Sequence, residues 1–480
     1  MHPLQKQNHL LWRAGFGPGA GQLGFTGNFQ PEKTFIDLLK ASEKTPVPFT
    51  IIEKLLAGMG QNPEGAMRQE QMTGDNSKEA AERRKAIQQK NREAIRDLNL
   101  AWLNKMIESP AQLREKMAFF WHGHFACRTQ NSFFSQQLLN TIRTHALSDF
   151  GTLLAEVSKS AAMLQFLNNQ QNRKYSPNEN FAREVMELFT MGRGNYTEQD
   201  VKEAARAFTG WGFNQAGEFQ FRRNQHDEGS KTILGKTGNY DGEQVLKILL
   251  EQPATAKFIC TKLYRFLVND TVNTKQVDWL AKRFFDSGYQ IKQLLTDLFT
   301  ADWFYAKENT GTHIKSPVEL WVGIRRQIPM QLANEEVQLL VQRALGQVLF
   351  YPPNVAGWQG GKTWIDSSSL LLRMRIPQLF ASAEGIEMNF KADDDAEMGQ
   401  GKRNPANMNR YRIKADIDWK QAFAAIEKIP EKTRYQQIAA GFLQTEKLPE
   451  QSFMDQFTGN ENRDANLAVA LMSLPEYQLC

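Results

Sequence analysis

The chain has 480 residues, of which 41% are hydrophobic and 23% charged, and its formal net charge is +5. This composition is ordinary for a soluble globular protein, and the length allows one large domain or two to three smaller ones. The small, evenly spread positive charge gives no reason to infer nucleic-acid binding, and no apolar run approaches the length of about 20 residues that a membrane span needs.

Helical spacing dominates the first 210 residues. A long charged helix is predicted at 79–108, with an apolar stripe at three- to four-residue intervals, and Ser109-Pro110 begins a new helix. Thr197 and Asp200 predict a capping box at the start of another helix. The remaining helices of this part are predicted at 31–42, 131–147, 149–157, 159–168, 179–191 and 197–211.

The pattern changes at 212–225, where residues 218–222 alternate in polarity and predict a short β-hairpin. Residues 346–366, rich in glycine, proline and aromatic residues, predict an ordered loop. Helices resume between and after these segments, at 241–251, 253–268, 274–286, 289–300, 316–328 and 333–345, and helical spacing returns in the tail at 417–475.

We therefore expect a mostly α-helical fold, a large multi-helix globule with one small β-hairpin element. Residues 1–390 are predicted to form the main helical domain. Residues 391–416 are polar and predict a flexible surface excursion. Residues 417–480 are expected to form C-terminal helices that pack back on the main domain.

The cysteines and the N-terminus indicate the compartment. Three cysteines far apart in the sequence fit a reducing environment and form no disulfide framework (Cys127, Cys260 and Cys480). The first residues contain no apolar signal core and no cleavage site of small residues. We therefore expect a cytoplasmic protein.

The helix predicted at 179–191 has an unusual polar stripe. Asn180, Arg183, Glu184 and Glu187 fall on one side, about 100° wide, of a helix that is otherwise apolar. Such a helix should be largely buried, so the stripe faces a pocket or a polar network. The two carboxylates can share a metal ion, share a proton or be held by arginine, and an ordinary solvated helix face is the simpler alternative.

Two further clusters carry histidine. Residues 121–125 read WHGHF, and a helix ending at Gly123 would let His122 and His124 turn toward one metal ion. Buried or capping histidines bonded to backbone carbonyls are the alternative. Residues 226–231 read HDEGSK and offer His226, Asp227 and Lys231 in a turn, which suits a metal ligand, a general base or an anion grip, or else is a plain polar turn.

Two loops are less specific. Residues 12–19 could form a turn that brings Arg13 to an anion, although the lysine and hydroxyl residue of a phosphate loop are missing. Residues 352–361 form a rigid turn in which Trp358 could stack on a sugar or another flat ligand, or simply pack the loop down.

These segments together resemble one bacterial family, the domain of unknown function 1800. The resemblance rests on residues 10–17, 121–125, 178–192, 207–211, 226–227, 352–358 and 474–477, in order over nearly the whole chain. It implies no established activity, because the family has none. It also implies a partner or shared pathway, because genes of this family often lie beside a sulfatase-like companion family.

Two residues depart from the pattern of that family. Gly123 stands where asparagine is common, and Phe189 stands where many members have histidine, so neither side chain can supply an essential polar group here. His122, His124, Glu184, Glu187 and His226 are all present.

From these residues we expect a metal-dependent hydrolase that uses zinc, iron or copper to activate a water molecule. His122, His124 and His226 would bind the metal, and Glu184 would be a fourth ligand or the base. The catalytic set would add Glu187, Arg183 and Asp227, and substrate contacts would come from Arg13, Lys231, Asn180 and Trp358. The competing hypothesis is a non-catalytic protein that binds or chaperones a partner, such as the sulfatase-like companion, with the polar clusters as a buried structural network.

Overall fold

The computed structural model describes residues 3–23, 29–52 and 77–382, the short strand at 385–386, and most of 411–480. The predicted surface excursion at 391–416 falls mainly on residues 391–410, which lie outside the described residues. Within the described part, helices predominate and the strands form only two-stranded antiparallel pairs. The predicted mostly α-helical class is therefore confirmed.

The helices begin and end close to the predicted positions. Ser77 caps the long helix α5 by accepting a hydrogen bond from the Ala80 amide, and Thr197 and Asp200 form the predicted capping box of α11. The helices up to residue 207 are α1 (Pro3–Arg13), α2 (Pro31–Ala41), α5 (Lys78–Glu108), α6 (Gln112–His124), α7 (Ser132–His145), α8 (Phe150–Lys159), α9 (Ala161–Phe166), α10 (Asn180–Glu184), the π-helical turn η3 (Val185–Thr190) and α11 (Glu198–Ala207).

The second half of the chain is also mainly helical. Its helices are α12 (Gly242–Leu250), α13 (Pro253–Leu267), α14 (Thr274–Asp286), α15 (Ile291–Phe299), α16 (Pro317–Gln327), α17 (Val337–Leu345), α18 (Ser367–Ser382), α20 (Trp419–Phe423), α21 (Glu431–Phe442) and α23 (Arg463–Met472). A capping box formed by Ser316 and Glu319 starts α16, with Pro317 at its first position. The tail ends in the 3-10 turn η9 (Pro475–Gln478).

The predicted hairpin is present, and the described residues contain further short strand pairs. Strand β1 (Trp211–Phe213) pairs with β2 (Phe219–Phe221). After a 3-10 turn (Arg223–Gln225), β3 (Lys231–Ile233) and β4 (Lys236–Gly238) form a second hairpin that was not predicted from the sequence. Two more pairs join distant segments: β5 (Met330–Leu332) with β8 (Ala415–Ile417), and β6 (Gly385–Ile386) with β7 (Tyr411–Arg412).

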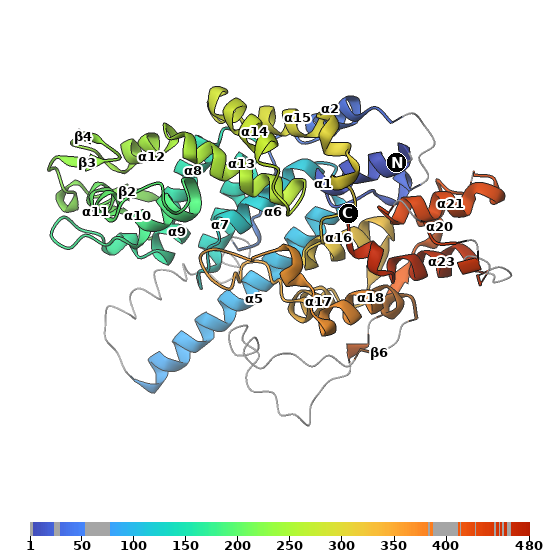
Figure 1. Cartoon of the computed structure of the whole chain (residues 1–480). Helices are drawn as coiled ribbons and strands as arrows, with labels where there is room; N and C mark the ends of the chain where they lie inside the picture. Colours follow the sequence, from blue (N-terminus) through green and yellow to red (C-terminus); the bar gives the residue numbers. More distant parts are fainter. Residues whose placement is uncertain are drawn as a thin grey trace.

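The elements are arranged along one long axis, as Figure 1 shows. The hairpin strands lie at one end with α10 and α11, and the C-terminal helices α20, α21 and α23 lie at the other. Helix α1 contacts α21, and α18 contacts α23, so the C-terminal helices pack against elements of the first 390 residues. The start of α5 extends away from the body of the molecule (Figure 1).

One continuous hydrophobic core joins these elements, and it contains buried charge. Four tryptophans in it have no appreciable exposure: Trp12, Trp102, Trp121 and Trp321. Glu115 and Arg143 form a buried ion pair at 2.7 Å, and the Trp102 indole donates to the same carboxylate at 3.0 Å. A buried carboxylate needs such partners, because an unpaired one would be very costly.

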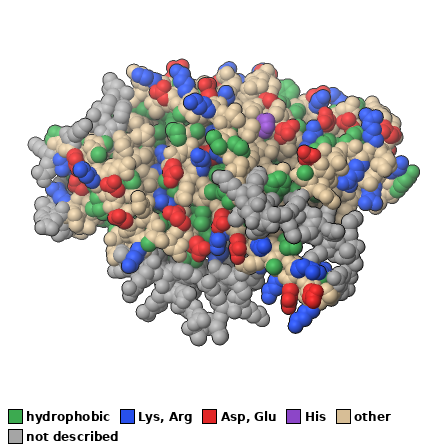
Figure 2. Space-filling model, turned by 180° about the vertical axis from the view of Figure 1, so that it is seen from behind, with side chains coloured by type: hydrophobic (Ala, Val, Ile, Leu, Met, Phe, Trp, Pro, Cys, Tyr) green, Lys and Arg blue, Asp and Glu red, His purple; other side chains and the backbone are tan. Residues whose placement is uncertain are grey.

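The surface carries mixed charge. On the face shown in Figure 2, lysine and arginine side chains are interspersed with aspartate and glutamate. Among the described helices, none combines the length and the apolar character that crossing a membrane would require.

Candidate acid–base site and the predicted clusters

The polar stripe predicted at 179–191 lies where α10 passes into the π-helical turn η3. The amide of Met191 donates to the carbonyl of Met186 at 3.0 Å, which is the five-residue spacing of a π-helix. The buried Thr190 hydroxyl supports this turn by donating to the carbonyl of Val185 at 2.7 Å. Wide turns of this kind often occur at functional sites.

The two carboxylates of the stripe, Glu184 and Glu187, lie in different surroundings. The carboxylate of Glu187 accepts a hydrogen bond from the Tyr196 hydroxyl at 2.8 Å and forms an ion pair with Arg193. Glu184 is half-buried and has no hydrogen-bond partner among the residues that the structure describes. One carboxylate is thus fully engaged, and its neighbour is available.

The pKa values of the two carboxyl groups move in opposite directions. Burial raises the pKa of Glu184, and the negative charge of Glu187 raises it further. Burial also raises the pKa of Glu187, but the hydrogen bonds from Arg193 and Tyr196 outweigh that effect and leave it lowered. The same burial and the bond to Glu187 raise the pKa of Tyr196 to about 12, so its hydroxyl keeps its proton at neutral pH.

Arg183 and Asn180 have structural partners instead of facing these carboxylates. The guanidinium of Arg183 bonds to Glu198 at 2.7 and 2.8 Å and to Glu179 at 3.1 Å, and a third of its side chain is exposed. The exposed Asn180 donates to the carbonyl of Leu167 at 3.2 Å. The predicted shared stripe therefore splits, because Arg183 turns toward the start of α11.

His122 anchors a loop. Its Nε2 accepts a hydrogen bond from the Phe350 amide at 3.2 Å, and the rings of Trp102, Phe350 and Trp358 surround it. Phe350 has a φ of 70°, a strained value for a residue with a side chain, and the bond to His122 holds it there. Gly357 allows the loop to pack closely against α6, because a Cβ at this position would lie 2.5 Å from the carbonyl oxygen of Gly123. Burial lowers the pKa of His122 to about 4.

His124 turns away from His122. Its Nε2 donates to the carbonyl of Phe189 at 3.2 Å, which ties the end of α6 to the π-helical turn. Its Nδ1 is buried and has no partner among the described residues. Burial and the positive charge of Lys262 lower its pKa well below the ordinary value. A buried neutral imidazole that bonds a carbonyl is the structural alternative raised from the sequence.

The cluster at 226–231 forms a self-contained turn. His226 Nδ1 lies 2.9 Å from the carbonyl of Thr209, and Asp227 is held by Arg206 at 2.7 Å. The buried ammonium of Lys231 donates to the carbonyl of Gly229 at 2.9 Å and to the side chain of Asn239 at 3.3 Å. These contacts leave Asp227 and Lys231 occupied within the fold.

The three histidines do not meet. His122, His124 and His226 have no neighbouring ring or hydrogen-bond partner in common. Within residues 3–23, 29–52, 77–382 and the described part of the tail, no three His, Cys, Asp or Glu side chains lie close enough together to hold a metal ion. The reason is directional, because residues two apart on a continuous helix point to opposite sides and α6 continues through Gly123 to His124.

Arg13 and Trp358 both contact other residues of the fold. The fully buried Arg13 donates to the main-chain oxygen of Cys480 at 2.7 Å and to the carbonyl of Asn309 at 3.3 Å. Trp358 is half-buried against the ring of His122, 5.9 Å between centroids. Trp358 thus packs its loop down, which was the structural alternative considered for it.

A buried charged centre that was not predicted from the sequence lies beside Arg13. Lys116 forms an ion pair with Glu319, and His313 lies 3.3 Å from the same carboxylate. Lys315 sits between the rings of Trp12 and Tyr477, at 3.7 and 3.8 Å from their centroids, and burial lowers its pKa to about 7. The capping box at residues 316–319 marks a helix start, but no periodic pattern shows that its glutamate also neutralises a buried lysine.

Tyr196 and Arg193, the partners of Glu187, were missed as well. Arg193 lies within a turn between Gly192 and Gly194, both with positive φ, and Tyr196 follows that turn, which folds the chain back onto η3. The paired glycines were the available signal for that reversal.

Comparison with known proteins adds a family and nothing more specific. A family model described as a protein of unknown function, DUF1800, matches residues 9–479. No curated protein and no solved structure matches the chain.

Proposed function

The chain belongs to the DUF1800 family, and from the geometry of η3 we propose that it is a hydrolase whose acid–base chemistry is carried by Glu184 with Glu187. The observation that carries this proposal is their geometry: Arg193 and Tyr196 hold Glu187, whereas Glu184 is half-buried and has no hydrogen-bond partner among the described residues. This difference displaces the pKa values of the two carboxyl groups in opposite directions. Two neighbouring titratable groups whose environments push their pKa values apart are the usual basis of an acid and base assignment.

Each carboxyl group has a distinct role in this proposal. Glu184 exchanges a proton with the leaving group or with the attacking water, because it is the available carboxyl and its raised pKa lies closer to neutrality. Glu187 stays ionised, and its charge both raises the pKa of Glu184 and stabilises positive charge that develops nearby. Arg193 and Tyr196 position Glu187. The bond broken is an ester or a related bond.

The metal-dependent form of this hypothesis has less support. It needs His122, His124 and His226 in one place, and each has separate neighbours. The proposed chemistry at Glu184 does not pass through these residues.

A second candidate function is non-catalytic partner binding. It is supported by the fact that His122, Asp227 and Lys231 all have partners within the fold, as expected of a structural network. The first partner to test is the sulfatase-like companion that the family resemblance implies. Co-purification of the two proteins, with no hydrolysis of any substrate by wild type in the assay described next, would favour it.

The test of the hydrolase proposal is a substrate panel with matched variants. Chromogenic carboxylic, phosphate and sulfate esters and glycosides are incubated with wild type, Glu184→Gln and the control Glu156→Gln, which changes an exposed glutamate of α8. We expect at least one substrate to be turned over by wild type and the control, and Glu184→Gln to lower kcat by about 100-fold or more. Equal rates in wild type and Glu184→Gln, or no turnover of any substrate, would refute the proposal.

A further inference from the structure

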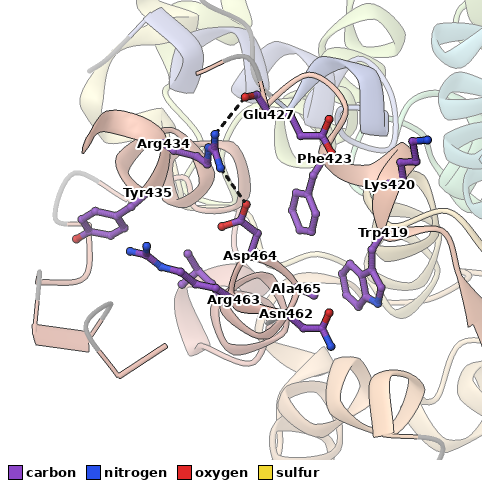
Figure 3. A pocket seen from close by; sticks show the side chains of 11 residues that line it. Trp419, Lys420, Phe423, Glu427, Arg434, Tyr435, Asn462, Arg463, Asp464 and Ala465 are labelled. Carbon is purple, nitrogen blue, oxygen red and sulfur yellow. Dashed lines mark hydrogen bonds and ion pairs between the residues drawn. The ribbon is translucent and has the colours of Figure 1, made fainter. Parts of the chain in front are cut away.

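A second site lies at the other end of the molecule, among the C-terminal helices. A cavity of about 330 Å³ is lined by side chains of α20, α21 and α23 (Figure 3). This volume lies within the range of small-molecule sites, about 300 to 1,000 Å³. Neither the carboxylates of η3 nor any residue named in the predicted clusters lines it.

One wall of the cavity is aromatic. The rings of Trp419 and Phe423 are nearly parallel, with an interplanar angle of 5° and centroids 5.7 Å apart. Trp419 is half-buried, so part of its indole remains accessible. Tyr435 of α21 also lines the cavity, with its ring pointing away from Trp419 and Phe423 (Figure 3). The Tyr435 hydroxyl donates to the carbonyl of Pro449 at 2.6 Å, which fixes the ring.

The other walls carry both donors and acceptors. Arg434 lies 3.8 Å from the carboxylate of Asp464 and donates to the carbonyl of Glu427 at 3.1 Å (Figure 3). The amide of Asn462 adds a donor and an acceptor, and Lys420 adds a donor. Planar carboxylate, amide and guanidinium groups thus surround an aromatic surface.

We propose that this cavity binds a sugar ring. The hydroxyl groups of a sugar both donate and accept, so they match Arg434, Asp464 and Asn462, while the apolar C–H face of the ring packs on Trp419. A purely apolar ligand would leave the side-chain amide of Asn462 without a partner when it excluded water. Two carboxylates, Glu427 and Asp464, offset most of the positive charge of Lys420, Arg434 and Arg463 in the lining, and a small anion would make no use of the aromatic wall.

The test measures binding to the full chain by saturation-transfer NMR. Glucose, N-acetylglucosamine, cellobiose and glucuronate are each added at millimolar concentrations to wild type, Trp419→Ala and the control Trp279→Ala. Trp279 is exposed on α14, outside the cavity, so its replacement tests the general loss of a surface indole. We expect at least one sugar to bind wild type and the control, with affinity for Trp419→Ala lower by about 10-fold or more.

A further variant and a competition experiment distinguish a sugar site from an unfolded C-terminal region and from an anion site. Trp419→Phe retains a flat aromatic surface and should recover part of the binding, which a merely unfolded C-terminal region would not. No binding by any of the four sugars, or equal binding to wild type and Trp419→Ala, would overturn the proposal. Displacement of the sugar by equimolar acetate or phosphate would also overturn it, because the cavity would then be an anion site.

Discussion

Glu184 and Glu187 show how far neighbours decide the chemistry of a residue. They have the same side chain and lie three positions apart, yet the pKa of one is raised and that of the other lowered. The difference comes from Arg193 and Tyr196, which bond only to Glu187. Helical spacing predicted that both carboxylates lie on one stripe. It could not predict which carboxylate would gain an ion pair and a hydrogen bond, because the partners lie in a turn six to nine residues after Glu187.

The burial of His122 predicts that the free energy of unfolding decreases at acid pH. Its pKa in the folded protein is about 4, below the ordinary 6.5, so the unfolded chain takes up a proton first as the pH falls. Its contribution to stability is therefore complete above pH 6.5 and is lost as the pH falls toward 4. From pH 7 to 4.5 this loss should be about 2 to 3 kcal/mol.

Urea unfolding of wild type and His122→Gln at the two pH values measures this loss. Glutamine can still accept the hydrogen bond of the Phe350 amide but does not titrate. The free energy of unfolding of the variant should decrease less than that of wild type between pH 7 and 4.5. An equal decrease in both proteins would show that His122 is not a buried neutral imidazole.

At the scale of elements, ordinary helices were predictable and the π-helical turn was not. The capping box of Thr197 and Asp200 was found from local pattern, because this signal lies within one turn of chain. The helix predicted to begin at Ser109-Pro110 is present but begins at Gln112, so Pro110 lies just before its first turn. The turn η3 depends on five-residue hydrogen bonds that leave no mark in apolar spacing. The β3–β4 hairpin was missed because the inward-facing Lys231 is charged, so the alternating burial of β3 does not appear as alternating polarity in the sequence.

Thr190 should support the π-helical turn. Replacing it with valine keeps the side-chain shape but removes the buried hydrogen bond to the carbonyl of Val185. We expect Thr190→Val to lower the free energy of unfolding by about 1 kcal/mol. The control Thr261→Val removes a similar bond at the surface of α13, to the carbonyl of Lys257, and should change stability by less than about 0.5 kcal/mol. A larger effect of the control than of Thr190→Val, by denaturant titration, would contradict this account.

At the scale of the whole molecule, helix α1 and the last residues of the described chain pack together in one hydrophobic core. Tyr477 is fully buried; its ring covers Lys315 opposite Trp12, and its hydroxyl donates to Gln327 at 2.6 Å. The segment containing Tyr477 was recognised as part of the family resemblance, but contacts between residues about 465 positions apart cannot be read from local pattern. The same limit explains why the three histidine-containing clusters were expected to meet and do not.

Tyr477→Ala tests how much the packing of Tyr477 against Lys315 stabilises the fold. Removing a buried aromatic ring leaves a cavity and an unshielded Lys315, so the free energy of unfolding should fall by about 3 to 5 kcal/mol. The control Tyr175→Ala changes a ring that is 90% exposed and should have an effect within about 0.5 kcal/mol. Similar unfolding midpoints for Tyr477→Ala and wild type would mean that the tail contributes little to the core.

The central claim is that the surroundings of two carboxyl groups in one helical segment displace their pKa values in opposite directions. Carboxyl-carbon NMR of glutamate-labelled protein, titrated with pH and assigned with Glu184→Gln and Glu187→Gln, tests it directly. We predict that Glu184 titrates above the ordinary value of 4.5 and Glu187 below it, and that Glu187→Gln moves the pKa of Glu184 downward. Titration of both groups at the same pH, or in the reverse order, would contradict the account.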